Sequence, residues 1–157
     1  MSLRTKCLLL LTCLLLICSG FPALVAADRA TSQKSEDALV ATYYQILNAG
    51  LKGGDFSVMA SVFAPDATLT ASTPLGSTVV VQGLSAIIAY YKNTASKFPG
   101  MQFIRDSTYD LSPTIVLNYE HAPIPSLSVP GRCSHLFVLR NSRIQELFWV
   151  AYSLARR

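Results

Sequence analysis

The spacing of apolar residues changes near Met101, and this change constrains the fold more than any other feature of the chain. Between Glu36 and Phe98 the apolar residues recur mostly every three or four positions, which is typical of amphipathic helices. Beyond Met101 they alternate with polar neighbours or occupy both alternate positions, which is typical of strands. Helices followed by a run of strands predict an α+β domain in which the helices pack on a mostly antiparallel sheet.

Three helices are predicted in the first part of the chain. The first covers about 36–51, with Ser35 as its N-cap and carboxylates in its first turn, where they favour the positive end of the helix dipole. A shorter second helix covers about 56–63 and ends before Pro65, because the residue before a proline is pushed out of helical geometry. The third covers about 84–98 and stops at a Pro-Gly pair.

Six strands are expected to pack on these helices. A short hairpin is predicted at 67–71 and 79–81, with its turn at Pro74 and Gly76, and the tight turn Asn141-Ser142 is expected to join the last two strands. The four longer strands are predicted at about 102–111, 114–121, 132–140 and 144–154.

The last two strands carry apolar residues on both alternate faces. An antiparallel strand with one face in water shows a polar residue at every second position, so this sheet is expected to be covered on both sides. Helices can cover the concave face, which leaves a second copy of the chain for the convex face and predicts a homodimer. The residues expected at that interface are Cys133, His135, Phe137, Phe148, Val150 and Tyr152.

The N-terminal segment has the three parts of a secretory signal peptide. Arg4 and Lys6 precede an apolar run at 8–17, and small residues follow up to Ala27, after which cleavage is expected. The mature protein would then be secreted or extracytoplasmic and free of the membrane. The alternative is an uncleaved anchor, because the segment has no charge from Cys7 onward and is about long enough to span a bilayer. The predicted parts of the chain are a signal peptide at 1–27, a flexible leader at 28–34 and one α+β domain at 35–157.

Cysteine count and charge exclude several classes of protein. Cleavage would leave Cys133 as the only cysteine, so no internal disulfide is expected. The net charge of +4 falls to +2 without Arg4 and Lys6, and the basic residues are scattered, which argues against nucleic acid as a partner. The two histidines lack the paired carboxylates of a metal site, so neither a metal nor a cofactor is predicted.

Four segments together resemble ketosteroid isomerase and the SnoaL-like branch of the nuclear transport factor 2-like superfamily. These segments are 41–50, 62–69 (Val-Phe-Ala-Pro-Asp-Ala-Thr-Leu), Gly83 followed by Tyr90-Tyr91, and 141–144. The resemblance covers the domain and implies a cone, in which a strongly bent, mixed sheet wraps three N-terminal helices and encloses a mostly apolar pocket, commonly in a dimer. Such pockets suit small, mostly apolar molecules.

The resemblance implies that the catalytic positions of ketosteroid isomerase are mostly lost. The position of its carboxylate base matches Ala71, and the position of its oxyanion-stabilising acid matches Ser134; neither residue can replace a carboxyl group. Only the oxyanion-stabilising tyrosine is kept, as Tyr43. Because a tyrosine with a pKa near 10 polarises a carbonyl and does not abstract protons at neutral pH, steroid isomerisation is not expected.

The remaining candidates form a predicted ligand site. Tyr43 and Ser134 are expected as polar contacts and Trp149, Leu136 and Leu147 as apolar walls, although each of them could instead be ordinary core. Two further groups are less specific: His121 as an acid or base near the pocket mouth, and Arg105 with Asp106 and Asp110, which we interpret as a solvated face.

Three functions fit this sequence. The first is an exported domain that binds a small, mostly apolar ligand, with or without catalysis. The second is an enzyme of the polyketide cyclase, isomerase or dehydratase type, and the third is a non-catalytic dimeric interaction module. An empty cavity at Tyr43 would favour ligand binding. An imidazole or carboxylate within hydrogen-bond reach of Tyr43 would favour the enzyme. A cone filled by core side chains would favour the interaction module.

Overall fold

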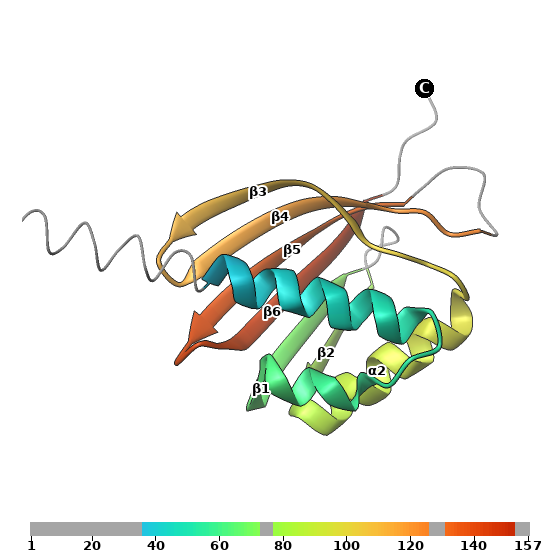
Figure 1. The fold of residues 1–157 in the computed structure, drawn as a ribbon, viewed down its shortest axis with the longest axis horizontal. Coiled ribbons are helices and arrows are strands. Elements are labelled where there is room, and N and C mark those ends of the chain that lie inside the picture. The colour runs from blue at the N-terminus through green and yellow to red at the C-terminus, as the bar shows by residue number, and fades with distance from the viewer. Residues whose placement is uncertain (1–35, 73–76, 126–130, 153–157) are drawn as a thin grey trace, which may run out of the picture. The chain divides into compact units, whose positions relative to one another are not determined.

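The computed structural model describes residues 36–72, 77–125 and 131–152 (Figure 1). The predicted signal peptide, the leader, the Ser35 cap and the turn at Pro74 and Gly76 lie outside these ranges. Within them the chain is an α+β domain, as predicted, with its helical elements before most of its strands. None of the described helices is long and apolar enough to cross a membrane.

The helical elements are close to those predicted from the period of apolar residues. Residues 36–51 are helical, and α2 covers Leu84–Lys97. Between them lies a single 3-10 helix, η1 (Phe56–Ser61), whose N-cap Asp55 accepts a hydrogen bond from the backbone N–H of Ser57 at 2.8 Å. Gly83 precedes α2 with a φ of 85°, a left-handed conformation that favours glycine.

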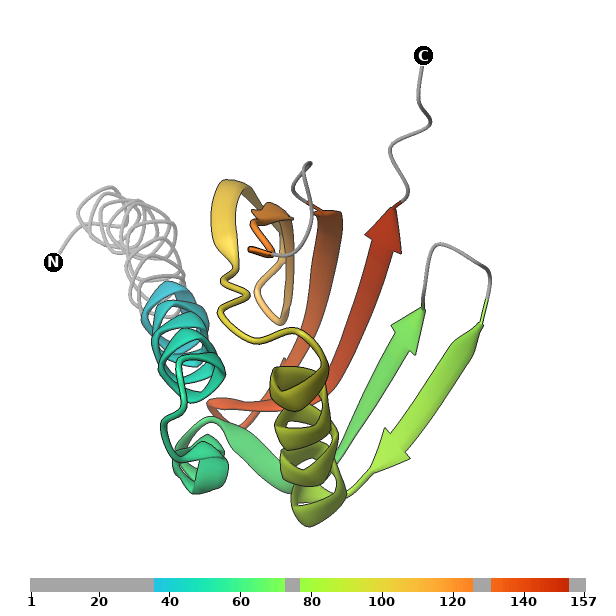
Figure 2. The ribbon, with the colours of Figure 1, turned by 90° about the vertical axis from the view of Figure 1, so that its right-hand side faces the viewer.

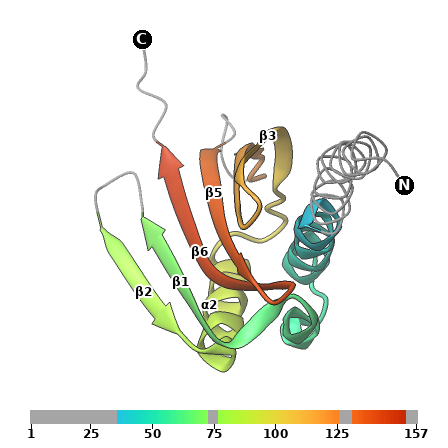
Figure 3. The same ribbon diagram turned by 90° about the vertical axis from the view of Figure 1, so that its left-hand side faces the viewer.

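Six strands form one mixed sheet in the order β2-β1-β6-β5-β4-β3. Only β1 and β6 run parallel; the other neighbours among the described strands are antiparallel. Figures 2 and 3 show the strands arching around α2 and the helix at 36–51, which both lie on the concave side. The strands are β1 (Phe63–Ser72), β2 (Thr78–Gln82), β3 (Ile104–Ser112), β4 (Ile115–Ala122), β5 (Gly131–Arg140) and β6 (Arg143–Tyr152).

The first strand begins earlier than predicted. β1 starts at Phe63, directly after η1, and passes through Pro65. The pairing of β1 with β6 is irregular between Phe63 and Thr68, so Pro65 lies where no ladder hydrogen bond is required of its nitrogen. Pro65 therefore marks the end of the helical segment, as predicted, but it lies inside β1 and does not interrupt that strand.

The register between β5 and β6 corrects the predicted faces of β5. The turn residues Asn141 and Ser142 have φ values of 50° and 55°, as in a two-residue hairpin. Regular pairing from this turn would place Ser134 opposite Trp149. The register shifts between Val138 and Leu139, however, so His135 pairs with Trp149. This one-residue shift exchanges the two faces of β5 relative to β6.

The core lies between the helices and the concave face. The helix at 36–51 buries Val40, Tyr43, Tyr44 and Leu47, and α2 buries Ile87 and Tyr91. The strands contribute the other side of this core. Their buried side chains include Phe63, Leu69, Val116, Glu120, Phe137, Ile144 and Leu147, each at most 1% exposed.

Candidate functional site

A row of residues crosses the concave face at the centre of the sheet. Ala71 of β1 pairs with Trp149 of β6, Trp149 pairs with His135 of β5, and His135 pairs with Asn118 of β4. Residues directly opposite each other on neighbouring strands share a face, so their side chains form a continuous strip beneath the helices. Ala71, the position that the resemblance assigns to a base, therefore lies in the same row as an imidazole two strands away.

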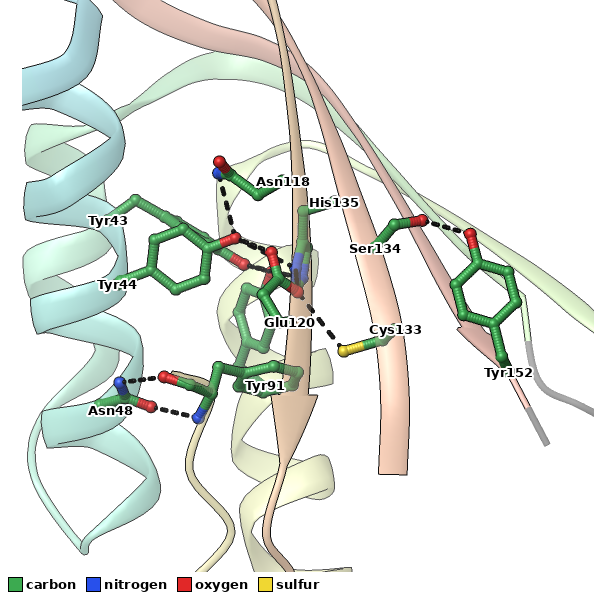
Figure 4. Close-up of polar contacts among 11 residues, drawn as sticks. Tyr43, Tyr44, Asn48, Tyr91, Asn118, Glu120, Cys133, Ser134, His135 and Tyr152 are labelled. Atoms are coloured by element: carbon green, nitrogen blue, oxygen red, sulfur yellow. Dashed lines mark hydrogen bonds and ion pairs between the residues drawn. The ribbon is translucent and has the colours of Figure 1, made fainter. Parts of the chain in front are cut away.

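His135 forms a buried pair with Glu120. Its Nδ1 lies 2.6 Å from Oε2 of Glu120, and the two side chains are 1% and 0% exposed (Figure 4). Glu120 also accepts hydrogen bonds from the Tyr44 hydroxyl and, at 3.4 Å, from the Cys133 thiol. Because the carboxylate acts as an acceptor throughout, we assign the hydrogen between it and the imidazole to Nδ1. A carboxylate that meets three donors can remain buried with its charge.

The second imidazole nitrogen faces a pair of tyrosines. Nε2 of His135 lies 3.4 Å from the Tyr43 hydroxyl, which lies 2.8 Å from the Tyr91 hydroxyl of α2. With Nδ1 protonated, Nε2 of the neutral ring carries a lone pair directed at Tyr43. Nε2 is therefore the basic atom of this site, and Glu120 holds the ring in the orientation and tautomer that make it so.

Burial keeps the tyrosine hydroxyls and the thiol around Glu120 and His135 protonated. It raises the pKa of Tyr43, Tyr44 and Tyr91 well above the ordinary tyrosine value, and the neighbouring Glu120 carboxylate raises the pKa of Tyr44 further. Burial, followed by the charge of Glu120, also raises the pKa of the Cys133 thiol. All four groups keep their protons at neutral pH, and the Tyr44 hydroxyl and the Cys133 thiol donate theirs to Glu120.

Two polar atoms in this row have no nitrogen or oxygen as hydrogen-bond partner among the described residues. They are Oδ1 of Asn118, whose Nδ2 donates to the Tyr44 hydroxyl at 3.3 Å, and Nε1 of Trp149. The Trp149 ring is stacked on His135, with 6.0 Å between the ring centroids and an interplanar angle of 10°. Trp149 is only partly buried, so it forms the boundary between His135 and the outside.

The structure brings together only part of the predicted ligand site. Tyr43, Leu147 and Trp149 face the helices, as expected, and Tyr43 and Leu147 are fully buried. Ser134 and Leu136 do not, because they pair with Val150 and Phe148 on the opposite face. The Ser134 hydroxyl lies 2.7 Å from that of Tyr152, and Figure 4 shows this pair on the far side of β5 from Glu120. Ser134 is therefore not a contact of this site.

Three of the residues predicted at a subunit interface instead face the interior. Cys133, His135 and Phe137 are at most 4% exposed, and His135 contacts Tyr43 of the first helix. The outward placement predicted for them is wrong, and the reason is the shifted register of β5. Phe148, Val150 and Tyr152 alternate with Leu147 and Trp149 on β6 and lie on the convex face, as predicted.

The other histidine lies on the convex side. Nδ1 of His121 is 2.6 Å from Asp106, which also accepts a hydrogen bond from Arg132 at 3.1 Å. His121 is therefore separated from Tyr43 by the sheet. Arg105 lies on the other face of β3 from Asp106, as alternation predicts, and its guanidinium carbon is 5.3 Å from the centroid of the Tyr44 ring.

Sequence reasoning missed the two residues that complete the site, Tyr44 and Glu120. Tyr44 directly follows Tyr43 and Glu120 directly precedes His121, and neither was among the predicted site residues. A usable signal was the alternation Val116, Asn118, Glu120 and Ala122, which places a carboxylate and an amide on one face of β4, the face that proved to be buried.

Two surface hollows border the sheet, and neither is lined by Tyr43. One has a volume of about 630 Å³ and the other of about 610 Å³. The first is lined by Gly100, Gln102, Ile104, His121, Pro123, Ile124 and Pro125; the second by Thr114, Val138, Leu139, Arg140, Asn141, Gln145 and Glu146. In the described ranges no three histidine, cysteine, aspartate or glutamate side chains gather where they could hold a metal ion.

The arrangement of this domain is shared with solved structures of low sequence identity. A protein from Jannaschia sp., described as a SnoaL-like polyketide cyclase, matches 75% of this chain and 85% of its own, with a TM-score of 0.62 and 14% identity. Bal32a, from a soil-derived mobile gene cassette, matches 78% and 93%, with a TM-score of 0.66 and 17% identity. A protein of Agrobacterium tumefaciens, described as an isomerase of the SnoaL-like family, matches 76% and 99%, with a TM-score of 0.59 and 16% identity.

The chain therefore has the cone-shaped α+β fold of these solved structures, as the sequence predicted. No protein-family model matches the sequence, and no curated protein is significantly similar to it. The fold supplies the frame, and the function has to be argued from the side chains within it.

Proposed function

We propose that this domain is an enzyme that transfers a proton at a small, mostly apolar carbonyl compound, with His135 as the base. The observation that carries the proposal is the Glu120–His135 pair, which leaves Nε2 facing the Tyr43 hydroxyl. An imidazole whose other nitrogen is held by a carboxylate can act as a general base, and the buried carboxylate stabilises the imidazolium that forms. Structures of this fold that are described as polyketide cyclases or isomerases support an enzymatic role.

Each residue has a distinct part in the proposed reaction. The substrate carbonyl accepts a hydrogen bond from Tyr43, whose raised pKa keeps its proton in place and whose hydroxyl is oriented by Tyr91. His135 removes the proton next to that carbonyl through Nε2 and returns it at another carbon or oxygen. Glu120 orients the ring and remains ionised.

The substrate reaches His135 from the side of Trp149 in this proposal. Trp149 is partly exposed and stacked on the imidazole, so displacement of one aromatic ring opens the site. The indole N–H, whose only hydrogen-bond contact among the described residues is with the Cys133 sulfur, a weak acceptor, is then available to a substrate oxygen. Ligand binding without catalysis would not need a base oriented by a buried carboxylate, and for this reason we favour the enzyme.

Deuterium exchange at the carbon next to the carbonyl of 2-tetralone tests this function. The protein is expected to accelerate the exchange, and His135→Gln is expected to reduce it by about 10²- to 10⁴-fold, the usual contribution of a general base. NMR of the ketone in deuterated buffer measures the rate. His121→Gln is the matched control, because His121 lies on the convex side, and should leave the rate unchanged. Equal rates for wild type and His135→Gln, or no acceleration by the wild type, would contradict the proposal.

We further propose that residues 1–27 direct export and are removed after Ala27. The charged, apolar and small-residue parts of this segment support export. Intact mass spectrometry of the exported protein measures the site directly. A mass that includes Met1 to Ala27 would show an uncleaved segment and contradict the proposal.

A further inference from the structure

Arg105 lies at the rim of the proposed site, on the concave face of the sheet. In the pairing of β3 with β4, Arg105 is directly opposite Glu120, so both side chains are on the face that carries His135. β3 is the edge strand of the sheet, and Arg105 is exposed, whereas Glu120 is fully buried. Arg105 and Glu120 therefore place a solvated guanidinium beside a buried carboxylate on the same face of the sheet.

The Tyr44 ring connects Arg105 with the base. The guanidinium carbon is 5.3 Å from the ring centroid of Tyr44, and that centroid is 5.8 Å from the centroid of His135. The contact with the ring is a cation–π contact and uses none of the guanidinium N–H groups in a hydrogen bond to a carboxylate. The hydroxyl of the same ring donates to Glu120, which fixes its position relative to Arg105.

No carboxylate of the described residues forms an ion pair with Arg105. Asp106, the next residue, lies on the convex face and is bound by His121 and Arg132. Glu120 is saturated by Tyr44, Cys133 and His135. The guanidinium is exposed, and its planar array of donors suits a bidentate carboxylate.

From this placement we propose that the site selects substrates that carry a carboxylate, which Arg105 binds at the rim while the ketone of the same molecule reaches Tyr43 and His135. This inference rests on the proposed function, because it assigns the second binding point of the same substrate. The apolar body of such a keto acid would lie along Tyr44, which lies between Arg105 and His135. The substrate class is thus a small keto acid with an oily body, and Arg105 is its specificity-determining residue.

The pair 4-oxocyclohexanecarboxylate and 4-oxocyclohexanecarboxamide tests this assignment. The two compounds share a ketone and differ in charge and little else. Trp149 is the only tryptophan of the chain and stacks on His135, so its fluorescence reports binding at the site. The wild type is expected to bind the carboxylate about tenfold more tightly than the amide, and this preference should weaken as salt is raised.

Variants at Arg105 separate charge from shape. Arg105→Met, which keeps the length of the side chain, should bind both compounds equally, and Arg105→Lys should restore part of the preference. Arg140→Met, which removes an exposed arginine at the β5–β6 hairpin, should retain the full preference. An equal affinity of the wild type for both compounds, no binding of either, or a preference that survives in Arg105→Met would overturn the inference.

Deuterium exchange of the same two ketones distinguishes this failure from failure of the proposed function. If His135→Gln abolishes exchange but Arg105→Met affects acid and amide equally, the base is correct and the carboxylate site is wrong. If Arg105→Met removes the preference for the acid but His135→Gln exchanges at the wild-type rate, the binding site is correct and the proton-transfer function is wrong.

Discussion

Glu120 determines the character of the site at the scale of single residues. It is 1% exposed, and a carboxylate buried to this degree is tolerated only when donors surround it. Tyr44, Cys133 and His135 supply these donors from the first helix and from β5. Removal of one donor leaves part of the carboxylate unsatisfied in the interior, and such a loss costs more than the hydrogen bond itself contributes.

Tyr44→Phe is expected to lower the free energy of unfolding by about 1.5–3 kcal/mol, the range for a buried hydrogen bond to a charged group. The phenylalanine ring fills the same space, so the loss measures the hydroxyl. Urea denaturation followed by circular dichroism provides the measurement. Val58→Ala is the control on η1, outside the proposed interface, where Val58 is 51% exposed, and should change the stability by less than about 0.5 kcal/mol. Equal losses in the two variants would contradict this account of Glu120.

The site residues could be predicted from the sequence only where one face of an element was clearly apolar. Tyr43 met this condition. Tyr44, one residue later on the helix, is also buried, because it packs against Glu120 and Asn118 of β4. On β4 the buried face carries Asn118 and Glu120, and the opposite face carries Leu117 and Tyr119. The polar residues of β4 therefore lie on the core side, where they belong to the buried polar cluster around His135.

The β5–β6 hairpin shows the limit of prediction at the scale of elements. Both strands and their turn could be predicted from alternation and from Asn141-Ser142, and β6 has the predicted faces. The register shift beside Val138 could not be predicted, because both faces of β5 are apolar and neither is marked by polar residues. One unpaired residue moved His135 from the predicted interface into the proposed site.

The convex face remains the best candidate for an interface. Across β3 to β6 it presents Tyr109, Tyr119, Val150 and Tyr152, which are 36–52% exposed. An apolar surface built by residues of three strands is typical of a subunit contact, and we propose that a second copy of the chain covers it through a twofold axis.

Val150→Glu is expected to convert the proposed dimer to a monomer, because two carboxylates would be buried near the axis without partners. Light scattering during size-exclusion chromatography measures the mass in solution. Val58→Glu, on η1 and 51% exposed in the wild type, is the control and should remain dimeric. A monomeric wild type, or a dimeric Val150→Glu variant, would contradict this interface.

At the scale of the whole molecule, the buried hydroxyls and the thiol make the free energy of unfolding depend on pH in the alkaline range. Tyr43, Tyr44, Tyr91 and Cys133 come from two helices and one strand and meet in one desolvated region. Burial raises the pKa of each in the folded state, so each retains its proton over a range of pH in which the unfolded chain has lost it. The folded state then binds more protons than the unfolded state, and stability must fall as pH rises.

The free energy of unfolding is therefore expected to be unaffected by these groups below about pH 8 and to decline from about pH 9 upward, where unfolded thiols and tyrosines ionise. Each group adds a slope of up to about 1.4 kcal/mol per pH unit. Urea denaturation at a series of alkaline pH values measures this slope. Tyr91→Phe removes one titrating proton and should make the decline shallower by that amount.

Ile87→Val is the control, a core variant that removes no titrating group, and it should lower the free energy of unfolding at every pH without changing the slope. A Tyr91→Phe curve parallel to that of the wild type would mean that this hydroxyl ionises as readily in the folded chain as in the unfolded one, which its complete burial beside Tyr43 does not permit.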